Sequence, residues 1–347
     1  MDKGNNDVSK NSGSPAKQVS KRQLLEKLII TLNTDTCFMY NEAAEVSSAA
    51  HNAKRSEDDV ARAWAGYVIT PSDLFVIYSV YLLSFATVSM VADMLKILKR
   101  KMPDKNIPVI REDSVRSRII EMCQSGVLAG KKITLGDKKV IIYTCVHNGF
   151  RLLQMQMQGY IYADDMLLAL NDMMIYERTA CSYCAVALAS LKGIACQEVQ
   201  GFGEDRSFGK EYRPKVHAKA DIRHGETEYI VAFEPIYYVC NEKLDIYENL
   251  ISRHRNRLKS MLRWAVSCQT VLHKEPKIII VCENMEGLKN AAVFIHNEIS
   301  ELEPYVSYTS ETVLRELRGS GLERAGFIRV NFCESGEMAF NVDVLFH

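Results

Sequence analysis

Residues 113–152 have the sequence DSVRSRIIEMCQSGVLAGKKITLGDKKVIIYTCVHNGFRL. The apolar residues of the first third recur at helical spacing, at Val115, Ile119, Ile120 and Cys123. Asp113 or Ser114 can accept hydrogen bonds from the free N–H groups of the first turn, and Gly126 is suited to end the helix. The pattern therefore predicts a capped amphipathic helix.

Two short strands are expected after this helix, at 131–135 and 140–146. The dipeptide Gly136-Asp137 between them favours a tight hairpin. A polar turn at 147–149 then leads into a Leu-rich helix. Helix, hairpin and helix in this order are typical of the second half of a winged helix-turn-helix.

The upstream half is predicted from two further helices, one through Leu74–Leu82 after Ser72 and one through Val91–Leu98 after Thr87. Ser72 and Thr87 are the expected N-caps. We therefore expect a winged-helix DNA-binding domain over residues 67–155.

Cations are concentrated on this domain. From residue 96 to residue 151 there are 13 Lys or Arg and 5 Asp or Glu, in a chain with a formal net charge of zero. A local excess of this kind indicates a phosphate-binding surface, although a solvated helical face is the alternative. The candidate DNA-binding residues are Arg111, Arg116, Ser117, Arg118, Lys131, Lys132, Lys138 and Lys139.

The stretch from residue 74 to residue 92 has no formal charge and is long enough to span a bilayer. Its polar middle and its two separate apolar stripes favour two soluble helices instead. The first twenty residues are rich in Lys, Asn, Ser and Gly and have no apolar core, so no secretory signal is expected. Ten cysteines without framework spacing then favour a cytoplasmic protein, with Cys181 and Cys184 on a buried helix face.

The remaining boundaries follow from composition. Residues 1–20 are predicted to be a disordered basic tail, and residues 21–66 a helical arm with an apolar face for which dimerisation is one option. Residues 156–347 are expected to form an α/β domain. Its predicted elements are a helix (176–192), strands (195–199, 216–222, 229–233), a helix (243–270), a strand (277–281), a helix (285–302) and a hairpin (327–332 and 338–346).

The order αβββαβ from residue 176 to residue 281 is the core order of the PD-(D/E)xK nuclease-like fold. Active members hold Mg²⁺ with an Asp on the second strand and a Glu or Asp on the third, followed two residues later by a Lys. The candidate catalytic and metal residues here are Asp221 and Glu234, with Ile236 at the position of the Lys. The domain is therefore expected to be inactive, with no cofactor, and Mg²⁺ is expected only if the site is active.

A second cationic patch is predicted on the helix that begins near residue 243. Arg253 and Arg257 lie one turn apart and face the same way. A solvated amphipathic face is the alternative to a phosphate track.

A winged helix followed by a degraded nuclease-like domain resembles the replication-relaxation family, which is encoded on plasmids and integrative elements. The likeness covers residues 70–285. The family motif Pro-Asp-Ala corresponds to Ala220-Asp221-Ile222, which lacks the Pro, and Glu-x-Asp corresponds to Glu234-Pro235-Ile236, which lacks the final acid.

The resemblance implies an α+β accessory protein of a mobile element that binds origin-region duplex DNA in replication or conjugative mobilisation. A relaxase or replication machinery and a second copy of the chain are the implied protein partners, and no membrane is expected. Two alternatives stay open. One is a transcriptional regulator with a ligand-sensing or dimerising α/β domain, and the other is a Mg²⁺-dependent nuclease.

Overall fold

The computed structural model describes residues 21–32, 55–107, 111–135, 138–157, 169–209, 213–237, 246–310, 313 and 326–344. These residues form a mixed α+β protein, so the coarse fold class predicted from the sequence is confirmed. The predicted tail (1–20) and the turn dipeptide at 136–137 lie outside the described residues.

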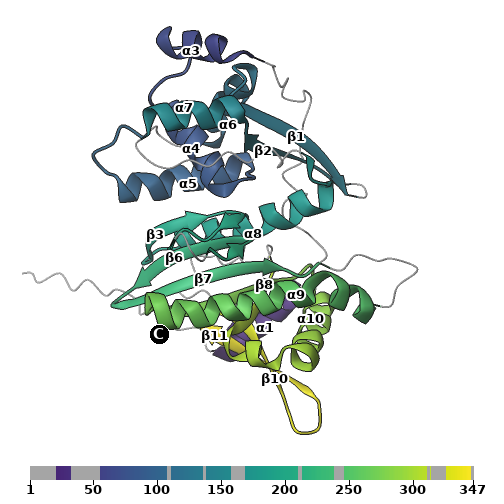
Figure 1. The fold of residues 1–347 in the computed structure, drawn as a ribbon. Helices are drawn as coiled ribbons and strands as arrows, with labels where there is room; N and C mark the ends of the chain where they lie inside the picture. Colours follow the sequence, from purple (N-terminus) through teal and green to yellow (C-terminus); the bar gives the residue numbers. More distant parts are fainter. Residues whose placement is uncertain are drawn as a thin grey trace, which may run out of the picture.

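Residues 73–156 form a unit that we call the helix-hairpin module (Figure 1). Its elements are α4 (Asp73–Leu83), α5 (Val88–Lys101), α6 (Glu112–Gln124), β1 (Leu128–Leu135), β2 (Lys138–Cys145) and α7 (His147–Gln156). β1 and β2 are antiparallel, with Leu128 opposite Cys145 and Leu135 opposite Lys138. The order of elements predicted for this region is therefore confirmed.

Local capping follows the prediction at one helix and departs from it at another. Thr87 caps α5, because its Oγ1 accepts a hydrogen bond from the Met90 N–H at 3.5 Å. Ser72 does not cap α4, because it has helical dihedral angles and its side chain makes no cap bond. At this end the Asp73 carboxylate accepts a 2.7 Å bond from the Thr70 N–H, so Asp73 holds the turn that precedes its own helix.

The start of α6 also differs from the prediction. The helix begins at Glu112, and Arg111 occupies the cap position without a side-chain bond. Neither Asp113 nor Ser114 is therefore the cap. Gly126 follows the end of the helix with φ +73°, a left-handed conformation that favours glycine and turns the chain into β1.

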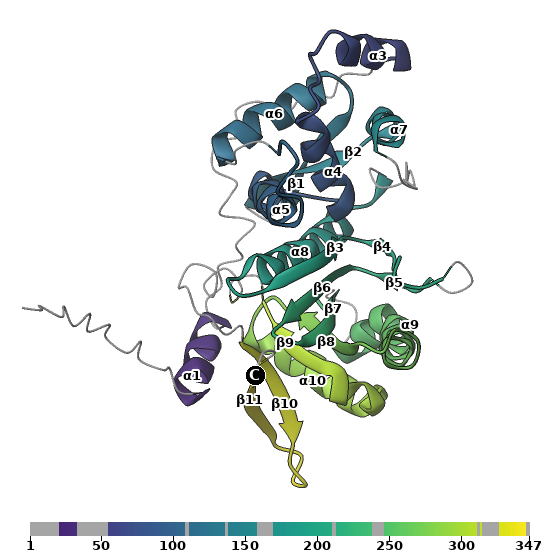
Figure 2. The same cartoon turned by 90° about the vertical axis from the view of Figure 1, so that its left-hand side faces the viewer.

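The predicted helical arm (21–66) contributes two described helices that lie far apart (Figures 1 and 2). α3 (Glu57–Ala65) lies beside the module, where Glu57 forms an ion pair with Arg151 at 3.3 Å. α1 (Lys21–Leu32) contacts the C-terminal hairpin β10–β11 instead. The apolar face of α1, including Leu24 and Leu28, is buried in this contact.

Residues 172–344 form a second unit that we call the sheet domain. Its helices are α8 (Asp172–Ser190), α9 (Ile246–Ser267) and α10 (Met285–Glu298), with short helical segments η2 (Cys268–Leu272) and η3 (Ser300–Tyr305). Its strands are β3 (Ala195–Gln200), β4 (Gly203–Glu204), β5 (Lys215–Val216), β6 (Ala218–His224), β7 (Thr227–Pro235), β8 (Glu275–Val281), β9 (Val306–Thr309), β10 (Gly326–Phe332) and β11 (Met338–Val344).

Seven of these strands form one mixed sheet in the order β11-β10-β9-β8-β7-β6-β3. β3, β6 and β7 are an antiparallel meander, and β8 and β9 are added parallel to β7 through the crossover helices α9 and α10. Within the main sheet the expected order αβββαβ is observed as α8-β3-β6-β7-α9-β8, and β9 then extends the sheet; the two-residue strands β4 and β5, which were not predicted, form a separate ribbon between β3 and β6. β9 has only four residues, which is too short for its pattern to be recognised in the sequence.

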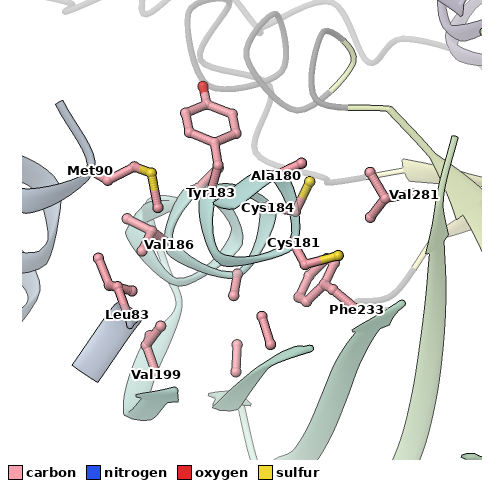
Figure 3. Close-up of a cluster of buried hydrophobic side chains, with 14 of the residues drawn as sticks. Leu83, Met90, Ala180, Cys181, Tyr183, Cys184, Val186, Val199, Phe233 and Val281 are labelled. Carbon is pink, nitrogen blue, oxygen red and sulfur yellow. The ribbon is translucent and has the colours of Figure 1, made fainter. Parts of the chain in front are cut away.

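Helices cover both faces of the sheet (Figure 2). α9 and α10 lie on one side, and α8 lies on the other, between the sheet and the module. Figure 3 shows α8 between Leu83 and Met90 of the module on one side and Phe233 and Val281 of the sheet on the other. The module and the sheet domain therefore share one apolar core that is centred on this helix.

The central position of α8 explains its composition. Its alanines and cysteines are buried all round the helix, and Cys181 and Cys184 have exposed fractions of zero. The prediction that this pair lies on a buried helix face is confirmed. Small side chains allow the sheet and two module helices to approach α8 closely.

The uncharged stretch 74–92 is divided between α4 and α5 rather than forming one long helix. Ser84 separates the two helices, and it has φ +62°. Among the described residues, every helix is too short or too polar to cross a bilayer.

Candidate functional site

The predicted DNA-binding residues of α6 lie in two different environments. Arg111, Arg116 and Ser117 are exposed, and the Ser117 hydroxyl donates a 3.1 Å bond to the backbone carbonyl of Asp113 within the helix. Arg111 and Arg116 take part in no ion pair with the described residues. These two guanidinium groups are therefore available to an external anion.

Arg118 has a different role because its guanidinium group is held within the module. Its Nε donates a 2.7 Å bond to Oδ1 of Asp73, and its two terminal nitrogens bond Asp73 and Glu121. The Asp73 side chain is only 3% exposed. Burial opposes ionisation of this carboxyl group, but the bonds from Arg118 and Thr70 outweigh it and lower the pKa of Asp73. Arg118 thus braces α6 against α4.

Two adjacent lysines of the hairpin are separated by the pleat of β1. The Lys131 ammonium group donates a 2.9 Å bond to the carbonyl of Leu170 and forms a 3.1 Å ion pair with Asp172 at the start of α8. Lys132 points to the opposite face of the strand and is exposed. Lys131 thus anchors the hairpin to α8. Lys138 and Lys139 lie at the start of β2, and their side chains are outside the described residues.

Arg116 on α6 and Lys132 on β1 are both exposed. Lys132 lies opposite Ile141 in the register, and strand alternation puts Tyr143 on the same face. Burial raises the pKa of the Tyr143 phenol, and the positive charge of Arg116 opposes the shift. Because α6 contacts β1, a partner bound across these two elements can meet both cations.

The sheet domain contains a buried ionic cluster at the end of β7. The Glu234 carboxylate, whose side chain is 1% exposed, accepts bonds from Arg257 Nε at 2.8 Å and Arg257 Nη2 at 3.0 Å. His217 Nδ1 lies 3.0 Å from the same carboxylate. Burial disfavours the charge on Glu234, but Arg257 and His217 outweigh it and lower its pKa to about 2.

Arg253 and Arg257 were predicted to face the same way and to form a cationic patch, but each contacts a carboxylate of this chain. Arg253 donates a 2.8 Å bond to Glu177 of α8, a residue that is 7% exposed. Burial raises the pKa of Glu177, and Arg253 and His217 partly offset the shift. The two arginines therefore join α9 to α8 and β7, and their charges are already balanced within the fold.

Asp221 and Glu234 do not meet. In the β6–β7 register Asp221 lies opposite Ile230, and the residue next to Glu234 is His217. Lys274 forms a 3.1 Å ion pair with Asp221, so this carboxylate has a cation of its own. Burial raises the pKa of Asp221, and the nearby lysines partly offset the shift.

Sequence reasoning missed the third ionic group of this face, which lies between the other two. The Lys219 side chain is fully buried, with its Nζ 2.5 Å from Asp205 and 3.3 Å from Glu198. The indole N–H of Trp264 donates a 2.8 Å bond to the second oxygen of Asp205. The alternation of His217, just before β6, with Lys219 and Asp221 on β6 is the signal that could have revealed this polar face beneath α9.

These three groups differ chemically from a divalent-metal site. A Mg²⁺ site needs several carboxylate or carbonyl oxygens turned toward one point. Here each buried carboxylate is turned toward a cation of the protein, and no group of three or more His, Cys, Asp or Glu within the described ranges could hold a metal ion. The arrangement is that of a structural ionic layer between the sheet and α9.

No protein-family model, curated protein or solved structure matches this chain.

Proposed function

We propose that this protein is a non-enzymatic DNA-binding protein that contacts duplex DNA through α6 and the β1–β2 hairpin. The observation that carries the proposal is the exposure of Arg111 and Arg116 on α6 and of Lys132 on β1, two elements that contact each other. Exposed cations on neighbouring elements suit contact with the phosphates of a duplex.

The arrangement of the module supports the same proposal. In a winged helix-turn-helix the third helix enters the major groove and the following hairpin contacts the backbone. α4, α5 and α6 are followed here by β1 and β2 in that order, and Ala86, between α4 and α5, forms an antiparallel bridge with Tyr143 of β2. This isolated bridge joins the hairpin to the connection between α4 and α5. α6 is then the recognition helix and the hairpin is the wing.

The proposal is tested by fluorescence anisotropy with labelled duplex DNA over a series of salt concentrations. The variant carries Arg111→Ala, Arg116→Ala and Lys132→Ala. Each phosphate contact that is lost lowers the slope of log affinity against log salt by about 0.9, and a base-reading contact costs roughly 1–3 kcal/mol. We expect weaker binding and a smaller salt slope than in the wild type.

The matched control carries Arg223→Ala, Arg263→Ala and Lys289→Ala, three exposed cations of the sheet domain. It removes the same charge from a different part of the molecule. If the two triple variants lost DNA affinity equally, binding would come from general electrostatic attraction rather than from an interface on the module. Unchanged binding in the first variant would contradict the proposal.

The cellular setting is the finer part of the proposal, and it rests on the resemblance to the replication-relaxation family. In that setting the protein binds the origin region of a plasmid or integrative element, together with a relaxase or the replication machinery. Footprinting on the element that encodes the protein separates the possibilities. Protection confined to the promoter of its own operon would favour the regulator, and protection at the origin would favour the accessory role.

A further inference from the structure

A cavity of about 400 Å³ lies where the helix-hairpin module meets the sheet domain. Both units line it. The module contributes Tyr81, Leu82, Ser84, Thr144, Cys145 and Phe150. The sheet domain contributes Gln200, Phe202, Gly203, Glu204, Arg206, Arg213 and Lys215. Its volume is within the range of small-molecule sites, and a boundary between two units is a common place for such sites.

The charged lining of the cavity is mainly cationic. Arg206, Arg213 and Lys215 are opposed by Glu204 alone. The contact between Arg213 and Glu204 is long, at 3.9 Å, and the Lys215 ammonium group has no ion pair within the described part of the chain. An anion bound here would therefore meet cations that the fold has not fully neutralised.

Two buried polar atoms beside this cavity have no hydrogen-bond partner among the described residues. They are the amide oxygen of Gln200 and the Nε of Arg213. Gln200 is 5% exposed, and its amide nitrogen is already used in a 2.6 Å bond to the carbonyl of Glu204. Because unpaired buried polar atoms are costly, a ligand that donates to Gln200 and accepts from Arg213 would gain by satisfying both atoms.

The apolar part of the lining is aromatic. The rings of Tyr81 and Phe150 meet edge to face, with centroids 5.9 Å apart, and the Arg206 guanidinium lies 5.1 Å from the Tyr81 centroid. Phe202 is held between the Arg178 guanidinium, 3.4 Å from its centroid, and the ring of His217. Tyr81 is 7% exposed and Phe150 is 3% exposed, so these rings give the cavity an apolar wall rather than an open stacking face.

We propose that this cavity binds a nucleoside monophosphate. Its phosphate accepts hydrogen bonds from Arg213 and lies beside Lys215, and its base packs against Tyr81 and donates an N–H to the Gln200 amide oxygen. A single ligand of this class supplies the anion, the planar ring, the donor and the acceptor that the lining requires.

The position of the cavity connects this site with the orientation of the module. The Gly201 N–H donates a 2.7 Å bond to the carbonyl of Leu82, and the Ser84 hydroxyl donates a 2.9 Å bond to the carbonyl of Phe202. The Thr144 hydroxyl of β2 in turn donates a 2.7 Å bond to the Ser84 carbonyl. A bound nucleotide thus contacts the residues that join the hairpin to the sheet domain, and through them it can change DNA affinity. This coupling rests on the proposed function, whereas nucleotide binding itself does not.

The binding test is calorimetry on the full chain with AMP, GMP, CMP and UMP, each compared with inorganic phosphate and with the matching nucleoside. We expect at least one nucleotide to bind about tenfold or more tightly than phosphate or nucleoside alone, because the nucleoside lacks the charge-assisted bond to Arg213 and phosphate lacks the contacts of the base. Absence of binding by all four nucleotides would overturn the proposal. Equal binding of nucleotide and phosphate would also overturn it.

Three variants locate the site. Arg213→Ala and the charge-conserving Arg213→Lys, which lacks the Nε–H, should each weaken nucleotide binding about tenfold or more. Arg223→Ala removes an exposed arginine of β6 and should leave binding unchanged. Circular dichroism confirms that each variant is folded, and wild-type affinity in both Arg213 variants would contradict the assignment.

The coupling is measured separately, as the DNA affinity of the wild type with and without the nucleotide. Because coupling between two ligands is reciprocal, DNA should change nucleotide affinity by the same factor. An unchanged DNA affinity would remove the coupling and leave the nucleotide site standing. A protein that binds nucleotide but no DNA would contradict the proposed function alone.

Discussion

The backbone N–H of Gly201 donates to the carbonyl of Leu82 across 2.7 Å, and this bond joins the end of β3 to the end of α4. The approach leaves no space for a side chain, because a Cβ on Gly201 would lie 2.0 Å from the Leu83 carbonyl oxygen. The two units of the molecule are thus held together by backbone contacts that only glycine allows at this position.

Replacing Gly201 with Ala should therefore destabilise the protein by about 3 kcal/mol, because the backbone must shift to relieve the overlap. Chemical denaturation measures the free energy of unfolding. Gly209→Ala is the matched control, since a Cβ at that glycine meets nothing within 4 Å. Similar free energies of unfolding in the two variants would show that the backbone around Gly201 can move away from Leu83 at little cost.

Arg118 and Arg116 were both predicted to contact DNA, but their alanine variants should differ. Arg118→Ala should mainly lower the stability of the fold, and Arg116→Ala should mainly weaken DNA binding. Arg118→Ala leaves the buried Asp73 carboxylate without its main cation. A loss of about 2 kcal/mol is expected, less than for a fully buried pair because Arg118 is 32% exposed. Arg116→Ala should change the free energy of unfolding by no more than about 0.5 kcal/mol.

The DNA affinities of the same two proteins should follow the opposite order when they are measured where both are folded. Arg116→Ala should weaken binding, and Arg118→Ala should have the smaller effect. A larger binding loss in the Arg118 variant would mean that this side chain leaves Asp73 to contact DNA.

The buried Glu234 makes the stability depend on pH. Its folded pKa of about 2 is below the ordinary value of 4.5, so its contribution is present above pH 4.5 and is lost as the pH falls toward 2. The full contribution is on the order of 3 kcal/mol, of which about 2 kcal/mol is lost by roughly pH 3.

The measurement compares wild type with Glu234→Gln by chemical denaturation between neutral pH and roughly pH 3. The glutamine cannot ionise, so the variant lacks this contribution at every pH. The difference in the free energy of unfolding between wild type and Glu234→Gln should be largest near neutral pH and should become smaller in acid. A deficit that is independent of pH would show that the ion pair with Arg257 does not hold the carboxylate in its charged form.

Divalent cations should not stabilise the protein, because Asp205, Asp221 and Glu234 each have a cation of the chain as partner. The melting temperature in millimolar Mg²⁺ or Mn²⁺ should equal that in EDTA, since only a ligand that prefers the folded state raises it. A rise with either metal that disappears in Glu234→Gln or in Asp221→Asn would favour the nuclease reading instead.

Part of the buried polar face of the sheet domain was within reach of the sequence. Gly225 lies between the predicted strands 216–222 and 229–233, and a two-residue turn at Gly225-Glu226 places His224 opposite Thr227, as observed. Counting back from it puts His217, and not Asp221, beside Glu234. Motif matching chose Asp221 because it is an acid, whereas hairpin register is set by turn length.

Other contacts could not have been anticipated. Arg118 and Asp73 are 45 residues apart in the sequence. Lys131 forms an ion pair with Asp172, and no sequence pattern around either residue indicates its partner. An arginine that reads DNA and one that braces a helix have the same side chain, and local spacing does not distinguish them. The partner on a neighbouring element makes the difference.

The amino-acid sequence by itself determined the helices, the hairpins and their order, because side-chain periodicity and turn residues act over a few positions and do not depend on the rest of the chain. Tertiary structure alone decided which charges remain free. Arg116 and Lys132 face solvent, whereas Arg118, Arg253 and Arg257 contact carboxylates contributed by other elements. The pairing of a charge depends on which distant groups the fold brings within a few ångströms, and this follows from how the elements pack and not from the sequence around each residue.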